Sequence, residues 1–228
     1  MPRRKPGVLS STLSLFSEAV RDIESQREPH AAFWDEWNAQ ALSETGPLWV
    51  ALGDSSSQGV GANDPLDGWV PQIQTRLRDH TGDPWRVVNL SITGAQYGDV
   101  ARYQIPRLEQ FVDGGNDVAL TTLIAGANNL IAPVSWPQAP GQLRSILGAL
   151  PDSRSVVARV GASSPLNSLM ARRFNATIEQ VATERNFALF WPWDWPSRDG
   201  LALDKFHPNE RGYRYMIDLV WPAMLEVL

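Results

Sequence analysis

The chain has 228 residues, no cysteine, and 20 basic against 25 acidic side chains, which gives a net charge of -5. This length fits one domain with a substantial core, the acidic balance argues against a nucleic-acid-binding protein, and the lack of cysteine excludes a disulfide framework, a thiolate zinc site and a cysteine nucleophile. Serines interrupt the apolar core that a signal peptide would need, and no segment approaches the roughly 18 apolar residues of a membrane span. We therefore expect a soluble, cytoplasmic protein.

The first 46 residues are predicted to form a helical arm outside the main domain, which covers residues 47–228. Pro29 is expected to end a first helix over residues 9–26, and a second short helix is expected over residues 31–42. We expect this arm to pack on the body of the protein; a dimer contact and a lid are the alternatives. One face of the first helix carries apolar side chains at steps of four and three: Leu9, Leu13, Phe16, Val20 and Ile23.

Residues 47–228 alternate between short apolar runs and helix-like segments, which is the pattern of βαβ units. Because the runs are apolar throughout, they are typical of strands that are buried on both faces. The sequence predicts a three-layer α/β/α sandwich around a five-stranded parallel sheet. The runs begin near residues 48, 86, 118, 156 and 187, and the helical segments cover residues 67–80, 99–111, 142–150, 166–185 and 208–220.

The first apolar run ends in Gly53-Asp54-Ser55, where a buried strand must turn sharply. A serine at such a turn presents its hydroxyl at the edge of the sheet, where a substrate can reach it. The next glycine after Ser55 is Gly59, so the segment lacks the Gly-x-Ser-x-Gly elbow of α/β-hydrolases. Asp54 is expected to hold the turn through backbone hydrogen bonds. A turn serine without a chemical role is the alternative.

His207 is the candidate base for that serine. It lies three residues after Asp204 and directly before Pro208, and a residue before proline is kept in an extended conformation. A turn can then bring the Asp204 carboxylate to one imidazole nitrogen and leave the other nitrogen to accept the serine proton. A loop histidine without a catalytic role is the alternative.

The other histidines and nearby acids are weaker candidates. His30 in the arm and His80 at the end of a polar helix are expected to be solvated surface residues. Asp194 and Asp199 are rival acids for the base, but neither has the short Asp-to-His spacing. The tryptophans of residues 191–196 are expected either to line an acyl or aryl pocket or to wedge an irregular loop against the body.

Glycine-rich or polar loops also follow the other apolar runs, and the carboxyl ends of parallel strands meet at one edge of a sheet. Gly94 would let the backbone approach a substrate closely, and the Asn128 amide could donate a hydrogen bond to a developing oxyanion. Taken alone, Gly94 is better interpreted as a turn glycine and Asn128 as a capping residue; together and in this order, the two favour an oxyanion hole.

These blocks, in this order, resemble those of the GDSL (SGNH) family of serine esterases and lipases over roughly residues 48–220. The resemblance implies a flavodoxin-like strand order and hydrolysis of carboxylic esters through an acyl-enzyme. It also implies a catalytic triad and an oxyanion hole. The triad would be Ser55, His207 and Asp204, and the hole would be formed by the Ser55 N–H, Gly94 and Asn128.

One position departs from the family pattern. The residue after Asn128 is usually aspartate in the family, whereas this chain has Asn129. The oxyanion asparagine is kept, so we expect the change to affect how the loop is held rather than the chemistry.

The sequence also bears on four other functions. A nucleotide-binding loop is weak, because Asp64 stands where the third glycine of Gly-x-Gly-x-x-Gly would be. A metal enzyme is disfavoured, because histidines are few and no ligand cluster is visible, and no cofactor is expected. An acyltransferase or a non-catalytic binding protein on the same fold stays open. The expected partner is a small-molecule ester with a short acyl or acetyl group, and the oligomeric state is left open.

Overall fold

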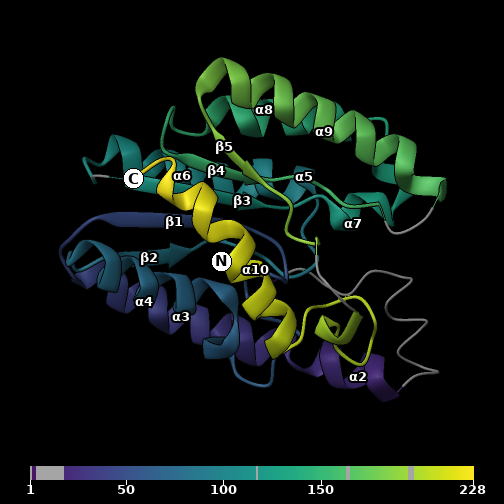
Figure 1. The fold of residues 1–228 in the computed structure, drawn as a ribbon, viewed down its shortest axis with the longest axis horizontal. Coiled ribbons are helices and arrows are strands. Elements are labelled where there is room, and N and C mark those ends of the chain that lie inside the picture. Colours follow the sequence, from purple (N-terminus) through teal and green to yellow (C-terminus); the bar gives the residue numbers. More distant parts are fainter. Residues whose placement is uncertain (1, 4–17, 117, 163–164, 195–197) are drawn as a thin grey trace.

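Five parallel strands form one sheet at the centre of the protein. The structure is a computed structural model that describes residues 2–3, 18–116, 118–162, 165–194 and 198–228. The strand order is β2-β1-β3-β4-β5, which is the flavodoxin-like order, so the predicted parallel sheet is confirmed (Figure 1). The strands are β1 Leu48–Gly53, β2 Arg86–Asn89, β3 Val118–Ile124, β4 Ser155–Ala158 and β5 Ala188–Phe190.

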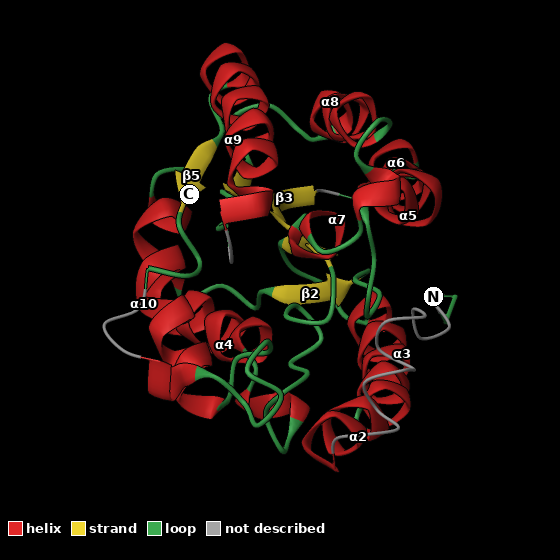
Figure 2. Ribbon diagram, turned by 90° about the vertical axis from the view of Figure 1, so that its right-hand side faces the viewer, coloured by secondary structure: helices red, strands yellow, loops and turns green. Residues whose placement is uncertain are grey.

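Helices cover both faces of this sheet, and Figure 2 shows the layers from the side. A π-helical turn, η2, joins α5 to α6, and short 3-10 turns lie in the loops. The α-helices are α2 Glu18–Ser25, α3 Arg27–Ser43, α4 Trp69–Thr81, α5 Tyr97–Asp99, α6 Ile105–Asp113, α7 Ala127–Leu130, α8 Ala139–Ala149, α9 Pro165–Arg185 and α10 Glu210–Leu225. The shorter turns are η1 Pro65–Asp67, η2 Val100–Gln104, η3 Pro133–Ser135 and η4 Arg198–Gly200.

The core is divided by the sheet into two apolar layers. Leu48, Val50 and Leu52 of β1 pack with α6, α8 and α9, whereas the alternate residues Trp49 and Ala51 pack with α4 and α10. All five side chains are fully buried. This two-sided burial explains why the strand sequences are apolar throughout rather than alternating.

The arm differs from its prediction at the helix boundary. The break between α2 and α3 lies at Gln26, and Pro29 is the third residue of α3 rather than the end of a helix. Proline is tolerated there because the first-turn N–H groups have no partner within the helix. The predicted apolar residues Leu9, Leu13 and Phe16 lie outside the described residues.

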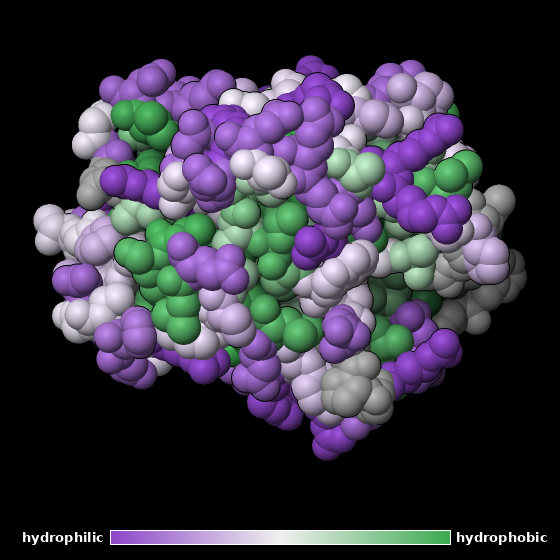
Figure 3. Space-filling view, turned by 45° about the horizontal axis from the view of Figure 1, so that its top comes forward, coloured by the Kyte–Doolittle hydropathy of each residue, from purple (hydrophilic) through white to green (hydrophobic). Residues whose placement is uncertain are grey.

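The register of the central strands decides where the polar loops meet. Gly53 at the end of β1 pairs with Ile124 at the end of β3, so residue 54 and the loop at residues 126–129 leave the sheet at the same edge. Within the described part of the chain, no helix is both long and apolar enough to cross a membrane. The face in Figure 3 carries apolar patches that hydrophilic side chains separate.

Candidate active site

Ser55 begins a tight turn at the carboxyl end of β1. Its carbonyl accepts hydrogen bonds from the N–H groups of Gln58 and Val60, both at 3.1 Å. Gly53 has φ +154°, and a Cβ there would lie only 2.4 Å from the carbonyl oxygen of Ile124. The Gln104 side chain makes two 2.8 Å hydrogen bonds with the Gly53 backbone, one to the N–H and one to the carbonyl. The end of β1 is therefore held from both sides.

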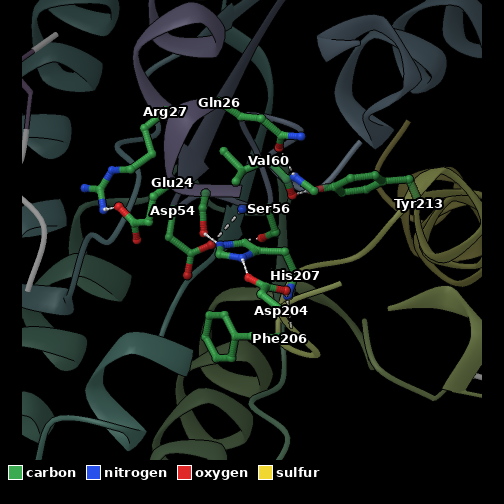
Figure 4. Close-up of polar contacts among 12 residues, drawn as sticks. Glu24, Gln26, Arg27, Asp54, Ser56, Val60, Asp204, Phe206, His207 and Tyr213 are labelled. Carbon is green, nitrogen blue, oxygen red and sulfur yellow. Dashed lines mark hydrogen bonds and ion pairs between the residues drawn. The ribbon is translucent and has the colours of Figure 1, made fainter. Parts of the chain in front are cut away.

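The structure brings the predicted trio together across 152 residues of sequence. The Nε2 atom of His207 lies 2.9 Å from Ser55 Oγ, and its Nδ1 atom lies 2.6 Å from Asp204 Oδ2. Figure 4 shows the His207 ring beside Asp204 and Phe206. The other carboxylate oxygen of Asp204 accepts the backbone N–H groups of Phe206 and His207, each at 3.0 Å. The short Asp-to-His turn thus closes on itself.

This arrangement keeps Asp204 ionised. Burial alone would raise the pKa of Asp204, but the hydrogen bond and charge of His207 and the two backbone N–H groups outweigh it and hold the pKa below its ordinary value. An ionised carboxylate at Nδ1 requires that nitrogen to carry the proton, so Nε2 faces Ser55 as an acceptor. The geometry can therefore pass a proton from a hydroxyl to an imidazole.

Asp54 forms a second buried carboxylate directly beside the serine. Its Oδ1 accepts from the N–H and the hydroxyl of Ser56 at 3.1 and 2.9 Å, and its Oδ2 lies 3.2 Å from the Asn128 amide nitrogen. Burial raises the pKa of Asp54, against the opposing effects of the Ser56 hydrogen bonds, the His207 charge and Asn128. The expected backbone bond of Asp54 is present, but the link to Asn128 was not predicted.

The two other predicted oxyanion donors lie on neighbouring loops. Asn128 Nδ2 is 3.2 Å from Asp54 and 3.1 Å from the carbonyl of Ala95, so both of its hydrogens face protein acceptors. Gly94 has φ +76° and directly follows Thr93, whose N–H and hydroxyl both donate to the side-chain oxygen of Gln58. The roles of Gly94 and Asn128 as donors remain predictions.

Asn129 explains how its loop is held without the usual aspartate. Its side chain is fully buried, and its Oδ1 accepts from the Tyr97 N–H at 2.9 Å. Its Nδ2 donates to the Ser135 hydroxyl at 3.0 Å, which in turn donates to the Ala132 carbonyl. An ionised aspartate could not donate to Ser135. The Asn129 amide therefore bonds to both Tyr97 and Ser135, whereas a carboxylate would keep the bond from Tyr97 but could not donate to Ser135.

A cavity of about 980 Å³ opens beside Ser55 and His207. Its apolar lining includes Trp193, so one of the clustered tryptophans lies in the wall, while Trp191 is exposed beneath the Arg159 guanidinium. Trp195 lies outside the described residues. The cavity is lined by Asp54, Ser55, Ser56, Ala127, Leu130, Ile131, Gly161, Ala162, Trp193, Arg198, Leu201, Lys205, Phe206, His207 and Pro208.

The remaining histidines and acids differ in their surroundings. The prediction that His30 is a solvated surface residue is wrong: it is only 2% exposed, and its Nδ1 lies 3.1 Å from the Gln58 carbonyl. Helix α3 packs on the loop after Ser55, which buries that ring. His80 is exposed and lies edge-on to Trp221. Asp199 contacts Arg211 and Tyr215.

The described residues hold no cluster of three histidine, aspartate or glutamate side chains that could bind a metal ion. Gln58 and Gln104 shape the site but were missed by the sequence analysis. Both are glutamines whose partners are backbone or hydroxyl groups of other loops, and no local sequence pattern marks such a contact.

Comparison with known proteins gives two kinds of match. The model of the GDSL-like lipase/acylhydrolase family matches residues 51–215. Among solved structures, that of TesA has a TM-score of 0.67 at 22% identity and covers 79% of this chain and 99% of that chain. The esterase EstA from Pseudoalteromonas sp. has a TM-score of 0.63 at 18% identity and covers 78% and 97%.

The acetylxylan esterase Axe2 from Geobacillus stearothermophilus, solved as a catalytic mutant, has a TM-score of 0.59 at 16% identity and covers 79% of this chain and 94% of that chain. The TM-scores of these three structures show a shared fold. No curated protein sequence matches the chain significantly.

Proposed function

The chain belongs to the GDSL-like lipase/acylhydrolase family and is a carboxylic-ester hydrolase, and we propose that it acts through a covalent acyl-enzyme formed on Ser55. Two short hydrogen bonds carry this proposal. Ser55 Oγ lies 2.9 Å from His207 Nε2, and His207 Nδ1 lies 2.6 Å from Asp204. A serine hydroxyl is a weak nucleophile without an adjacent base, and this contact supplies one.

The proposed reaction has two halves. Ser55 Oγ attacks the ester carbonyl while His207 Nε2 accepts the hydroxyl proton, and Asp204 stabilises the imidazolium that forms. The imidazolium then gives its proton to the departing alcohol, which leaves the acyl group on Ser55. A water molecule, deprotonated by the same imidazole, releases the acid and regenerates the hydroxyl.

The oxyanion donors in this proposal are the backbone N–H groups of Ser55 and Gly94 and the Asn128 amide. Because both Asn128 hydrogens already face acceptors, the oxyanion takes the hydrogen that the Ala95 carbonyl accepts in the free protein. The Asp54 carboxylate keeps the amide plane fixed during this exchange. The two backbone N–H donors are fixed by the fold, so they can lower the barrier without reorienting as charge develops.

For the substrate we propose a small ester with a short acyl or acetyl group. The cavity of about 980 Å³ has room for such an ester, and Leu130 and Ile131 are among its apolar lining residues. We also propose that residues 47–228 form the catalytic unit, with residues 1–46 as an arm outside it. That the enzyme acts in the cytoplasm remains a prediction from sequence.

The test is covalent labelling. An organophosphonate should form one covalent adduct, and peptide mapping should place it on Ser55. The structurally similar esterase EstA has been solved in a form inhibited by monoethylphosphonate. Ser55→Ala should take no label, and His207→Ala should lower kcat on 4-nitrophenyl acetate by roughly 10²–10⁴. An adduct on another residue, or a change of under tenfold in His207→Ala, would contradict the proposal.

A further inference from the structure

One face of the N-terminal arm contacts the loops of the candidate active site. The residues on this face recur at steps of three and four along α2 and α3, which places them on one side of a nearly continuous helical path. Each packs on, or hydrogen-bonds to, a residue of those loops or the last residue of β2. They are Ile23, Gln26, His30, Trp34 and Asn38.

The middle of this face holds the serine turn. The His30 Nδ1 and the Trp34 Nε1 both donate to the backbone carbonyl of Gln58, each at 3.1 Å. The Gln58 side chain in turn donates to the Ser91 carbonyl at 2.9 Å and accepts from the N–H and hydroxyl of Thr93. The arm thereby reaches the loop that carries Gly94 through a single buried residue.

The beginning of the face supports the histidine loop. The Gln26 side-chain oxygen accepts the Gly61 N–H at 2.8 Å, and a Cβ at Gly61 would lie 2.1 Å from the Pro208 carbonyl and 2.8 Å from His207 Cβ. Gly61 is therefore packed against the backbone that carries the imidazole. Figure 4 shows Gln26 of the arm and Tyr213 of α10 both approaching the Val60 segment, and the Tyr213 hydroxyl donates to the Val60 carbonyl at 2.7 Å.

An apolar contact joins the same two loops. Ile23 of α2 forms a buried cluster with Val60 and Ala202, and the Ala202 N–H donates to the His207 carbonyl at 2.8 Å. One arm side chain thus shares a buried cluster with a residue of the turn after Ser55 and a residue of the segment before the imidazole.

The end of the face closes the edge of the sheet. The Asn38 side chain accepts from the Asn89 N–H at 2.7 Å and donates to the Asn89 carbonyl at 2.8 Å. The Asn89 side chain then donates to the Ser57 carbonyl at 2.6 Å and accepts from Ser91. Asn38 therefore pairs with the last residue of the edge strand, and Asn89 relays that contact to the serine turn.

From these contacts we infer that the arm face is a positioning element, which fixes the Ser55 turn relative to the Gly94 and His207 loops. The inference rests on the proposed function. The arm lies outside residues 51–215, which the family model matches, so this role is additional to the shared fold. A displacement of about 1 Å between reacting groups can lower a rate by about 10²-fold, so loosening one of these contacts should reduce turnover.

The test distinguishes the effect of the Gln26 hydrogen bond from the effect of the space that its side chain fills. Gln26→Met keeps the length of the side chain but removes the acceptor, whereas Gln26→Glu keeps an oxygen that can accept the Gly61 N–H. Gln40 is the matched control, because it lies on α3 and is exposed, and within the described part of the chain its side chain donates to Glu44, the residue that follows the helix. Gln26→Met should lower kcat on 4-nitrophenyl acetate by about tenfold or more with KM within about threefold. Gln26→Glu should restore kcat, and Gln40→Met should match the wild type.

Hydrogen exchange gives a second measurement that needs no turnover. Peptides that contain Gly61 should exchange faster in Gln26→Met than in the wild type or Gln40→Met, with the unfolding midpoint of each variant measured alongside. A wild type that is inactive on esters but shows this exchange difference would refute the proposed function and leave the arm contact standing. An active wild type in which Gln26→Met and Gln40→Met behave alike, or in which kcat falls only in proportion to the unfolded fraction, would overturn the inference.

Discussion

The carboxylate of Asp54 offers the sharpest test of how the Asn128 amide is held. Asp54→Asn keeps the size and shape of the side chain but replaces one oxygen with an NH₂ group. If the amide oxygen stays on Ser56, the new NH₂ faces the NH₂ of Asn128; if the side chain flips, it faces the N–H of Ser56 instead. Either orientation sets two donors against each other.

The expected loss is that of one hydrogen bond to a charged group, which is about 1.5–3 kcal/mol. If the loss falls entirely on the orientation of Asn128, kcat drops by about 10- to 150-fold, since about 1.4 kcal/mol corresponds to a factor of ten. Asn128→Ala removes the proposed oxyanion donor itself and should cost about 10²–10³ in kcat. The single substitution at Asp54 should therefore be the milder of the two.

A double-mutant cycle measured by kcat on 4-nitrophenyl acetate decides between the two explanations. If Asp54 acts through Asn128, the double variant should be no slower than Asn128→Ala alone, because the carboxylate has nothing left to orient. Effects that multiply would show that Asp54 acts on the reaction by another route. Circular dichroism and the unfolding midpoint of each variant provide the control for misfolding.

Three further outcomes follow from the structure. Gly61→Ala should lower kcat about tenfold or more, because φ is +105° and a new Cβ would push on His207; unchanged kcat contradicts this. Burial lowers the pKa of His30 despite its carbonyl partner and a nearby acid, so the unfolded chain binds more protons below about pH 6.5. The contribution of His30 to the free energy of unfolding is then fully present above that pH and is lost as pH falls. Urea unfolding at pH 7.5 and 5 should therefore show a larger loss of stability in the wild type than in His30→Gln. Equal losses in the two proteins would refute this role of His30. Arg198 and Lys205 line the cavity and can attract an anionic substrate. Arg198→Gln should therefore lower the ratio of kcat/KM for the anion 4-acetoxybenzoate to kcat/KM for its neutral methyl ester about two- to fivefold. An unchanged ratio would exclude a role of Arg198 in binding anions.

The sequence predicts the layered fold because its signal is strong at each strand. A run such as Leu48 to Leu52 is apolar at every position, which only a strand covered on both faces explains well. Once the sheet is parallel, the ends of its strands share one edge, and Ser55 and the loop of Asn128 must come out together. The turn from Asp204 to His207 is local, so its hydrogen bond is also within reach of sequence analysis.

The contacts of the arm could not be predicted in this way. Glutamine and asparagine are mostly exposed and histidine is intermediate, so Gln26, His30 and Asn38 have the composition of a solvated helix face. Their partners are backbone atoms of segments more than 20 residues away, and a backbone atom leaves no mark in the sequence. The error at His30 arose from this, because its burial depends on tertiary packing rather than on its neighbours in sequence.

Buried polar side chains explain why such a site can hold a distance of 2.9 Å. A buried amide without partners costs about 1–3 kcal/mol, so a loop built on Gln58 or Gln104 is stable only in the arrangement that satisfies these groups. The Gln58 side chain has three such contacts, and Gln104 has two to Gly53 alone. Apolar side chains of similar size would fill the same space but would allow several arrangements of the loops. The polar network therefore adds specificity of geometry to a fold whose stability comes from its two apolar layers.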